Sequence, residues 1–96
     1  MYKVIILPLA QKDIKQASIW YNSKQKGLGK KFTAEVREVV LFIKQNPKAC
    51  VIRYDKTRTA VLKVFPFMIH YNIMDSTILI SAVLHTSRNP EKWLKP

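Results

Sequence analysis

Apolar residues in the first half of the chain recur at the spacing of an α-helix. A short apolar run from Val4 to Leu7 comes first and predicts a buried strand. Pro8 then stands where a helix begins, because its missing N–H costs nothing in the first turn. The stripe that follows consists of Ala10, Ile14, Ala17 and Tyr21. This stripe predicts a helix with one face in the core.

A second apolar stripe predicts a second helix. Its members are Leu28, Phe32, Val36, Val39, Val40 and Ile43. Gly27 and Gly29 mark the break between the helices, since glycine readily adopts the positive φ found at helix ends. Asn46 and Pro47 end the second helix, because the residue before a proline is pushed out of the helical region. So short a link predicts an antiparallel helical hairpin.

The second half of the chain changes to the pattern of strands. Four strand-like runs cover Val51–Tyr54, Ala60–Phe65, Phe67–Met74 and Thr77–His85. They are separated by a turn at Asp55-Lys56-Thr57 and a tight hairpin at Asp75-Ser76. Near the end, Asn89-Pro90-Glu91 has the order of a cap, a first-turn proline and an acid favoured by the helix dipole. A short terminal helix should carry Trp93 back onto the body.

The whole pattern predicts one α+β domain over residues 1–96: an N-terminal strand, an antiparallel helical hairpin packed on a mainly antiparallel twisted sheet, and a short C-terminal helix. Alternation separates two faces of the sheet. The apolar face, made by Phe67, Ile69, Tyr71 and Ile73, should pack against the hairpin. The mixed face, made by Met68, His70, Asn72 and Met74, should stay partly open. Arg53, Lys63 and His85 are expected on or near it, where an acidic amphipathic segment could bind; a half-solvated face covered by long charged side chains is the alternative.

The charge balance is strongly basic. Seventeen Lys and Arg face six Asp and Glu, for a formal net charge of +11. This excess indicates an anionic partner, either nucleic acid or an acidic protein. A surface made basic for solubility alone is the alternative, although acidic residues serve solubility better.

Cysteine usage and hydropathy bear on the compartment. Cys50 is the single cysteine, so no intrachain disulfide can form, which fits a reducing cytosol. The run from Val4 to Leu7 is too short for a signal segment or a membrane span. We therefore expect a cytoplasmic protein.

Candidate chemistry is sparse. The sequence contains no HExxH, no CxxC and no glycine-rich phosphate loop, so neither a metal nor a cofactor is expected. The remaining candidates are His70, His85, Arg58, Arg88, Lys63 and Tyr71. Imidazole, guanidinium and phenol groups together can cleave RNA by acid–base chemistry and charge stabilisation. Two histidines on separate strands form no motif, so a structural role is the alternative for each.

Several segments, in order along the chain, resemble the RelE/ParE superfamily of toxins from type II toxin–antitoxin systems. The run from Lys63 to Tyr71 resembles the family's "fPy-x-I-x-Y" strand. The run from Ala82 to Pro90, followed by Trp93, is similar to its "A-V-x-H-x-x-R-x-P-x-x-W" terminus. Weaker similarities occur at Val4–Leu7, Ala10, Asp13-Ile14, Tyr21, Gly27-Leu28-Gly29, Phe32 and Asn46-Pro47.

The resemblance implies a helical hairpin on an antiparallel sheet and a cognate antitoxin that wraps the toxin. The net charge of +11 would suit an acidic antitoxin and speed its association. It also implies one of two targets. RelE-like members cut mRNA in the ribosome, whereas ParE-like members poison DNA gyrase.

Met68 helps to separate these two mechanisms. RelE-like nucleases commonly carry an arginine at this position to hold phosphate, and methionine can carry no charge there. We therefore favour a ParE-like toxin, with a RelE-like nuclease as the alternative and a basic nucleic-acid-binding module as a further one. If the chain is a nuclease, the catalytic candidates are His85, Arg88 and Arg58. The candidate partner-binding residues are Arg53, Arg58, Lys63, Met68, His70, Arg88 and Trp93.

Overall fold

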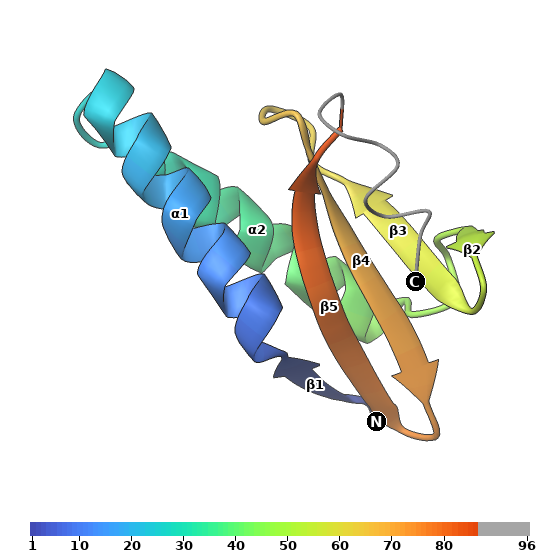
Figure 1. The fold of residues 1–96 in the computed structure, drawn as a ribbon. Coiled ribbons are helices and arrows are strands. Elements are labelled where there is room, and N and C mark those ends of the chain that lie inside the picture. Colours follow the sequence, from blue (N-terminus) through green and yellow to red (C-terminus); the bar gives the residue numbers. More distant parts are fainter. Residues whose placement is uncertain (87–96) are drawn as a thin grey trace.

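The computed structural model describes residues 1–86 as two helices and five strands (Figure 1). In chain order the elements are β1 (Lys3–Ile6), α1 (Pro8–Lys24), α2 (Leu28–Gln45), β2 (Ile52–Tyr54), β3 (Thr57–Val61), β4 (Phe67–Met74) and β5 (Thr77–His85). The predicted strand, helical hairpin and meander are therefore all confirmed. The predicted C-terminal helix, with Arg88 and Trp93, lies outside the described residues.

The five strands form one mixed sheet in the order β1-β5-β4-β3-β2. Three neighbouring pairs are antiparallel, and only β1 runs parallel to its neighbour β5. Two-residue links close the β2–β3 and β4–β5 hairpins, and Asp55 (φ 49°) and Asp75 (φ 55°) take the left-handed conformation in them. Aspartate tolerates this conformation better than most residues, which suits both positions. Because β1 lies beside β5, α1 begins against the last strand.

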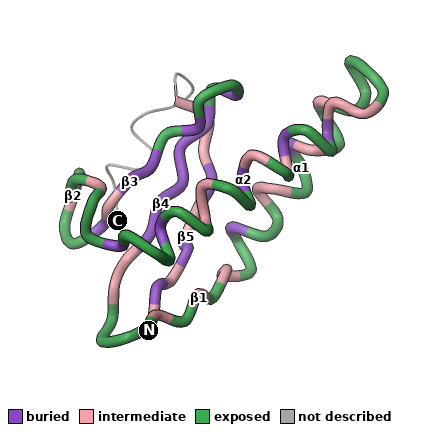
Figure 2. The backbone as a smooth tube through the Cα atoms, turned by 180° about the vertical axis from the view of Figure 1, so that it is seen from behind, coloured by how far each residue is buried: buried purple, intermediate pink, exposed green. Residues whose placement is uncertain are grey.

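The helical hairpin covers one face of the sheet and buries the two apolar stripes there (Figure 1). Ala10 and Ala17 of α1, and Phe32, Val36 and Ile43 of α2, are buried as predicted. Figure 2 shows the buried residues concentrated along β4 and β5 and at intervals along the two helices. The sheet contributes its predicted apolar face to this core: Phe67, Ile69 and Tyr71 are buried and Ile73 packs against them. Burial of this face against the hairpin is therefore confirmed.

The third strand differs from its predicted range of Ala60–Phe65. It begins earlier, at Thr57, because the turn at Asp55 is tight enough to place Thr57 opposite Tyr54. It also ends earlier, at Val61. The backbone N–H groups of residues 63, 64 and 65 donate to the carboxylate of Glu35 on α2, at 2.7 to 3.2 Å. Since these groups bond a side chain, they are not available to a strand ladder.

The mixed face of the sheet, which lies opposite the helical hairpin and which we call the second face, is more closed than predicted. Met68 is 6% exposed and His70 is 0% exposed, so neither lies on an open surface. Asn72 is half-buried and Met74 is exposed. The prediction of an open face was wrong at its centre, because His70 is buried within a set of polar side chains from β2 and β3 that alternation alone does not reveal.

Candidate functional site

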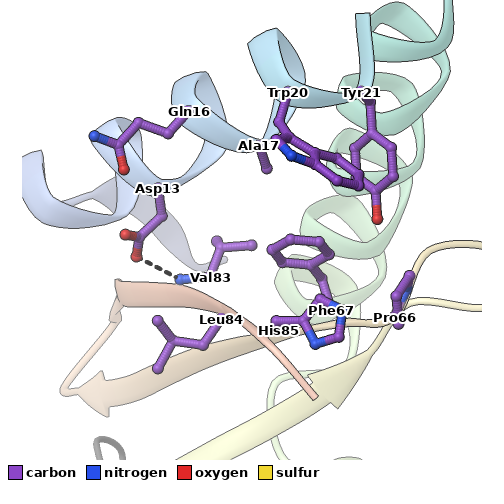
Figure 3. A pocket seen from close by; sticks show the side chains of 10 residues that line it. All are labelled: Asp13, Gln16, Ala17, Trp20, Tyr21, Pro66, Phe67, Val83, Leu84 and His85. Carbon is purple, nitrogen blue, oxygen red and sulfur yellow. Dashed lines mark hydrogen bonds between the residues drawn. The ribbon is translucent and has the colours of Figure 1, made fainter. Parts of the chain in front are cut away.

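A groove runs between α1 and the end of β5 (Figure 3). It has a volume of about 860 Å³. The helix contributes Asp13, Gln16, Ala17, Trp20 and Tyr21, and the sheet side contributes Pro66, Phe67, Val83, Leu84 and His85. Figure 3 shows the aromatic side chains at one end of the groove and the carboxylate of Asp13 towards the other end. Ligand sites are commonly clefts with mostly apolar walls and a few placed polar groups, and this groove has that composition.

The groove exists because β1 is shorter than β5. Pairing between the two strands ends at Ile6 opposite Ile80, and the amide of Leu7 makes one further bond to the carbonyl of Ile80 at 2.9 Å. The chain then turns away into α1. Beyond that point the amide of Val83 donates to the carboxylate of Asp13 at 3.0 Å (Figure 3). A side chain thus takes the place of the missing strand, and the edge of β5 lies along the groove floor.

Aromatic rings form the apolar wall of the groove. Tyr21 and Phe67 have ring centroids 6.1 Å apart, and both contact the buried ring of Phe32. Trp20 stands at the rim with 55% of its surface exposed, and the Lys24 ammonium lies 5.1 Å from its ring centroid. Exposed tryptophan beside a cleft is typical of protein-binding surfaces.

His85 lies in this groove and not on the second face, where the sequence placed it. It pairs with Phe67 across β4 and β5, and the two rings meet edge to face at a centroid distance of 5.3 Å. Because cross-strand partners point to the same side of a sheet, His85 shares the hairpin side with Phe67. The placement on the open face was wrong, since register decides it.

A polar cluster occupies the second face over β2, β3 and β4. The Tyr54 hydroxyl lies 3.0 Å from Nδ1 of His70, and Arg53 Nε donates to the hydroxyl of Thr59 at 3.1 Å. Burial, together with the nearby charge of Arg53, lowers the pKa of His70 to about 4. Burial also raises the pKa of Tyr54. At neutral pH both groups are therefore uncharged, and the cluster is a neutral buried network beside one cation.

Arg58 is committed to the backbone. Its guanidinium donates to the carbonyl of Cys50 at 2.6 Å and to that of Lys48 at 3.4 Å. The Tyr71 hydroxyl donates to the carbonyl of Pro47 at 2.8 Å, and burial raises the pKa of Tyr71. Both side chains therefore hold the segment that joins α2 to β2.

The predicted site residues divide into separate places. Arg53, Met68 and His70 come together on β2 and β4, whereas Lys63 is exposed in the link between β3 and β4. Arg58 pairs with Tyr71, four positions along β4 from the Phe67 that pairs with His85. At about 3.4 Å per residue, this separates Arg58 and His85 by about 14 Å along the strand. Within residues 1–86, His85 and Arg58 do not form one site.

Asp13 and Glu35 were missed as functional positions, although the sequence held a signal for both. Each acid stands at a helical position facing the apolar stripe: Asp13 between Ala10 and Ala17, and Glu35 beside Phe32. A carboxylate on a core-facing stripe must find donors, which predicts a backbone or side-chain partner. The pattern does not say which loop or strand edge supplies them.

No group of three or more His, Cys, Asp or Glu side chains is arranged to hold a metal ion among residues 1–86. Neither described helix is long and apolar enough to cross a bilayer.

Comparison with solved structures defines the fold class of the chain, and comparison with family models then defines its family. A solved structure described as the chromosomal ParDE TA system from P. aeruginosa matches with a TM-score of 0.70. It covers 91% of this chain and 98% of that chain at 16% identity, so the two share one α+β toxin fold. No curated protein matches the sequence. The family model described as the ParE toxin of the type II toxin–antitoxin system parDE matches residues 4–90. The chain therefore belongs to the ParE toxin family, which works with a cognate antitoxin, and the resemblance seen in the sequence is confirmed.

Proposed function

We propose that this chain is a cytoplasmic toxin that arrests growth by poisoning DNA gyrase and is neutralised by its antitoxin. The observation that carries the proposal is the match of residues 4–90 to the ParE toxin family. Gyrase is the target that the resemblance to ParE-like toxins implies. The match spans both helices, strands β2 to β5 and β1 from Val4 onwards, and it includes the groove residues.

The geometry of the second face supports gyrase over RNA as the target. Met68 stands where nuclease relatives hold phosphate with an arginine, and it is buried. His70 beside it is neutral and buried, so it does not supply the missing charge. Loss of one positioned phosphate donor typically costs about 10²–10³ in rate.

The groove between α1 and β5 is the proposed docking site of the antitoxin. Its wall of Tyr21 and Phe67, with Trp20 at the rim, suits the apolar side of an amphipathic segment. The net charge of +11 suits an acidic partner and would speed its encounter with the toxin. A segment of this kind that folds on binding would cover the groove and the edge of β5 together.

Titration of purified gyrase with the protein tests the target. We expect inhibited supercoiling with trapped cleaved DNA, relieved by the antitoxin. Undisturbed gyrase at excess of a folded, growth-arresting protein would contradict the proposal. Ribosomal mRNA cleavage that is lost in His85→Ala or Arg88→Ala would instead support the RelE-like alternative.

Substitution of Trp20 tests the docking site. Trp20→Ala should weaken antitoxin binding by about thirtyfold, equivalent to about 2 kcal/mol, because tryptophan is enriched among the few interface residues that carry most of the binding energy. Phe42→Ala is the matched control, since Phe42 is 47% exposed on α2 and does not line the groove. Equal losses in the two variants, measured by calorimetry, would place the antitoxin elsewhere.

A further inference from the structure

The turn between α1 and α2 carries an unbalanced cluster of lysines. Between Asp13 and Glu35 the chain has five lysines and no acidic residue. Four of them, Lys24, Lys26, Lys30 and Lys31, flank the turn and are exposed. We call these four the lysine tip. The nearest acids in the sequence, Asp13 and Glu35, lie eleven positions before Lys24 and four positions after Lys31.

The lysine tip is held on a stiff support. The side-chain oxygen of Asn22 accepts hydrogen bonds from the amides of Gly27, at 2.9 Å, and Gly29, at 3.3 Å. Gly27 adopts a φ of 87°, and a Cβ at Gly29 would overlap the carbonyl oxygen of Ser18. The two helices therefore meet closely in one turn geometry. Ordering this backbone in the free protein lowers the entropy that binding would otherwise lose.

The tip projects away from the rest of the molecule. Figure 1 shows the end of the helical hairpin extending past the sheet, and Figure 2 shows the same projection from behind with the turn largely exposed. A charged tip that stands clear of the body can approach a broad, flat or convex surface without a clash.

The tip and the groove differ in the chemistry that they offer. From Tyr21 to Val40, a stretch that the structure describes completely, no large apolar side chain is exposed. Protein–protein interfaces depend on apolar and aromatic anchors at their centre, and lysine is depleted there. Phosphate backbones are bound largely by cationic charge, without such anchors.

We propose that the lysine tip binds the phosphate backbone of double-stranded DNA, without base specificity. The choice of DNA rests on the proposed function, because a gyrase poison acts on an enzyme that holds duplex DNA. The groove then takes the antitoxin, and the tip contacts DNA from the end of the hairpin beyond Trp20, with Lys24 at the boundary between the two surfaces. Toxin and nucleic acid would meet through charge alone, with a strong dependence on salt.

Fluorescence anisotropy with a labelled DNA duplex of mixed sequence tests this proposal. The tip variant replaces Lys24, Lys26, Lys30 and Lys31 with Gln. The control variant replaces four exposed lysines elsewhere, Lys3, Lys44, Lys48 and Lys56, and so removes the same charge. Between about 50 and 200 mM salt, the tip variant should lower the log–log salt slope by about 3 to 4, since each phosphate contact contributes about 0.9.

The result expected is a loss of duplex binding of tenfold or more in the tip variant, with a much smaller loss in the control. Equal losses in both variants, or no duplex binding by the wild-type chain at the low-salt end, would overturn the proposal. If the tip variant unfolds, the pairs Lys24→Gln with Lys26→Gln and Lys30→Gln with Lys31→Gln replace it. Since no gyrase is present, failure of this test is distinct from failure to poison gyrase.

Discussion

The two faces of the sheet bury their side chains by different physical means. On the face covered by α1 and α2, the buried side chains are mostly apolar and gain free energy by leaving water. On the opposite face, the central buried residue is His70, beside Thr57 and Thr59. Polar groups gain from burial only if they keep hydrogen-bond partners. The partners are paired as Tyr54 with His70, Arg53 with Thr59, and Thr57 with Asn72.

This difference predicts two kinds of sensitivity. The hairpin face depends on volume, because apolar packing has no direction but leaves a cavity when atoms are removed. The opposite face depends on register and protonation, because each hydrogen bond needs one geometry and one charge state. Substitutions and pH changes should therefore affect the two faces differently.

Removal of Phe32 should have the largest effect. Its ring is fully buried and packs against Tyr21, Phe65 and Phe67 at centroid distances of 5.1 to 5.5 Å. Phe32→Ala should lower the free energy of unfolding by about 3–5 kcal/mol, measured by urea denaturation. Phe42→Ala on the same helix, at an exposed position, should cost less than about 1 kcal/mol. Similar costs in the two variants would contradict the volume argument.

The second-largest effect should be a loss of unfolding free energy on acidification, caused by His70 on the opposite face. The pKa of His70 is lowered to about 4 in the folded chain, below about 6.5 in the unfolded chain. The unfolded state therefore binds more protons between these values, so the stabilisation is fully present above about pH 6.5 and declines as the pH falls towards about 4. The expected loss is about 2–4 kcal/mol.

Denaturation of the wild type and His70→Gln at several pH values separates this effect from others. Gln cannot titrate, so the slope of stability with pH should flatten in the variant between about pH 6.5 and 5, above the range where carboxylates titrate. The comparison uses slopes, so any fixed cost of the substitution cancels. Parallel slopes for the two proteins would show that His70 does not lose its proton on folding.

Most of the fold could be predicted from the sequence because the apolar stripes are strong and regular. Ala10 and Ala17 at helical spacing, and Phe67 and Ile69 at strand spacing, identify the buried faces without any knowledge of register. The start and end of β3 could not be predicted in this way. The start depends on the left-handed turn at Asp55. The end depends on the carboxylate of Glu35, which lies twenty-eight positions before Lys63, the first residue whose amide it binds.

The site was harder to predict, because it depends on pairing between distant segments. The groove exists since β1 ends opposite Ile80 while β5 continues, and its Asp13–Val83 bond spans seventy positions. Alternation gave the correct face for Phe67 but not for His85, because register was needed to pair the two. Residue types alone suggested that His70 was accessible, and only the β2–β3–β4 arrangement shows its burial.

Substitution of Glu35 tests a set of polar contacts on the side of the sheet that the hairpin covers. Its carboxylate accepts hydrogen bonds from the amides of Lys63, Val64 and Phe65, and so joins the β3–β4 link to α2. Glu35→Ala should cost about 1.5–3 kcal/mol, the range for hydrogen bonds to a charged acceptor. Hydrogen exchange should also increase at these three amides. Glu38→Ala, at an exposed position of the same helix, should leave both measurements nearly unchanged. Equal effects of the two substitutions would show that the hydrogen bonds of Glu35 do not stabilise the β3–β4 link.

The smallest effect expected is that of a single hydroxyl on the opposite face. Tyr54→Phe removes the oxygen that lies 3.0 Å from Nδ1 of His70 but keeps the ring, whose centroid is 5.8 Å from that of the imidazole. The expected cost is about 1 kcal/mol, and Tyr2→Phe is the control because Tyr2 makes no hydroxyl bond to another described residue. In the double variant with Tyr54→Phe and His70→Gln, the loss of unfolding free energy should differ from the sum of the two single losses by about 0.5 kcal/mol or more. Additive costs would mean that the hydroxyl and the imidazole do not stabilise each other, and that the opposite face is held by the same non-directional packing as the hairpin face.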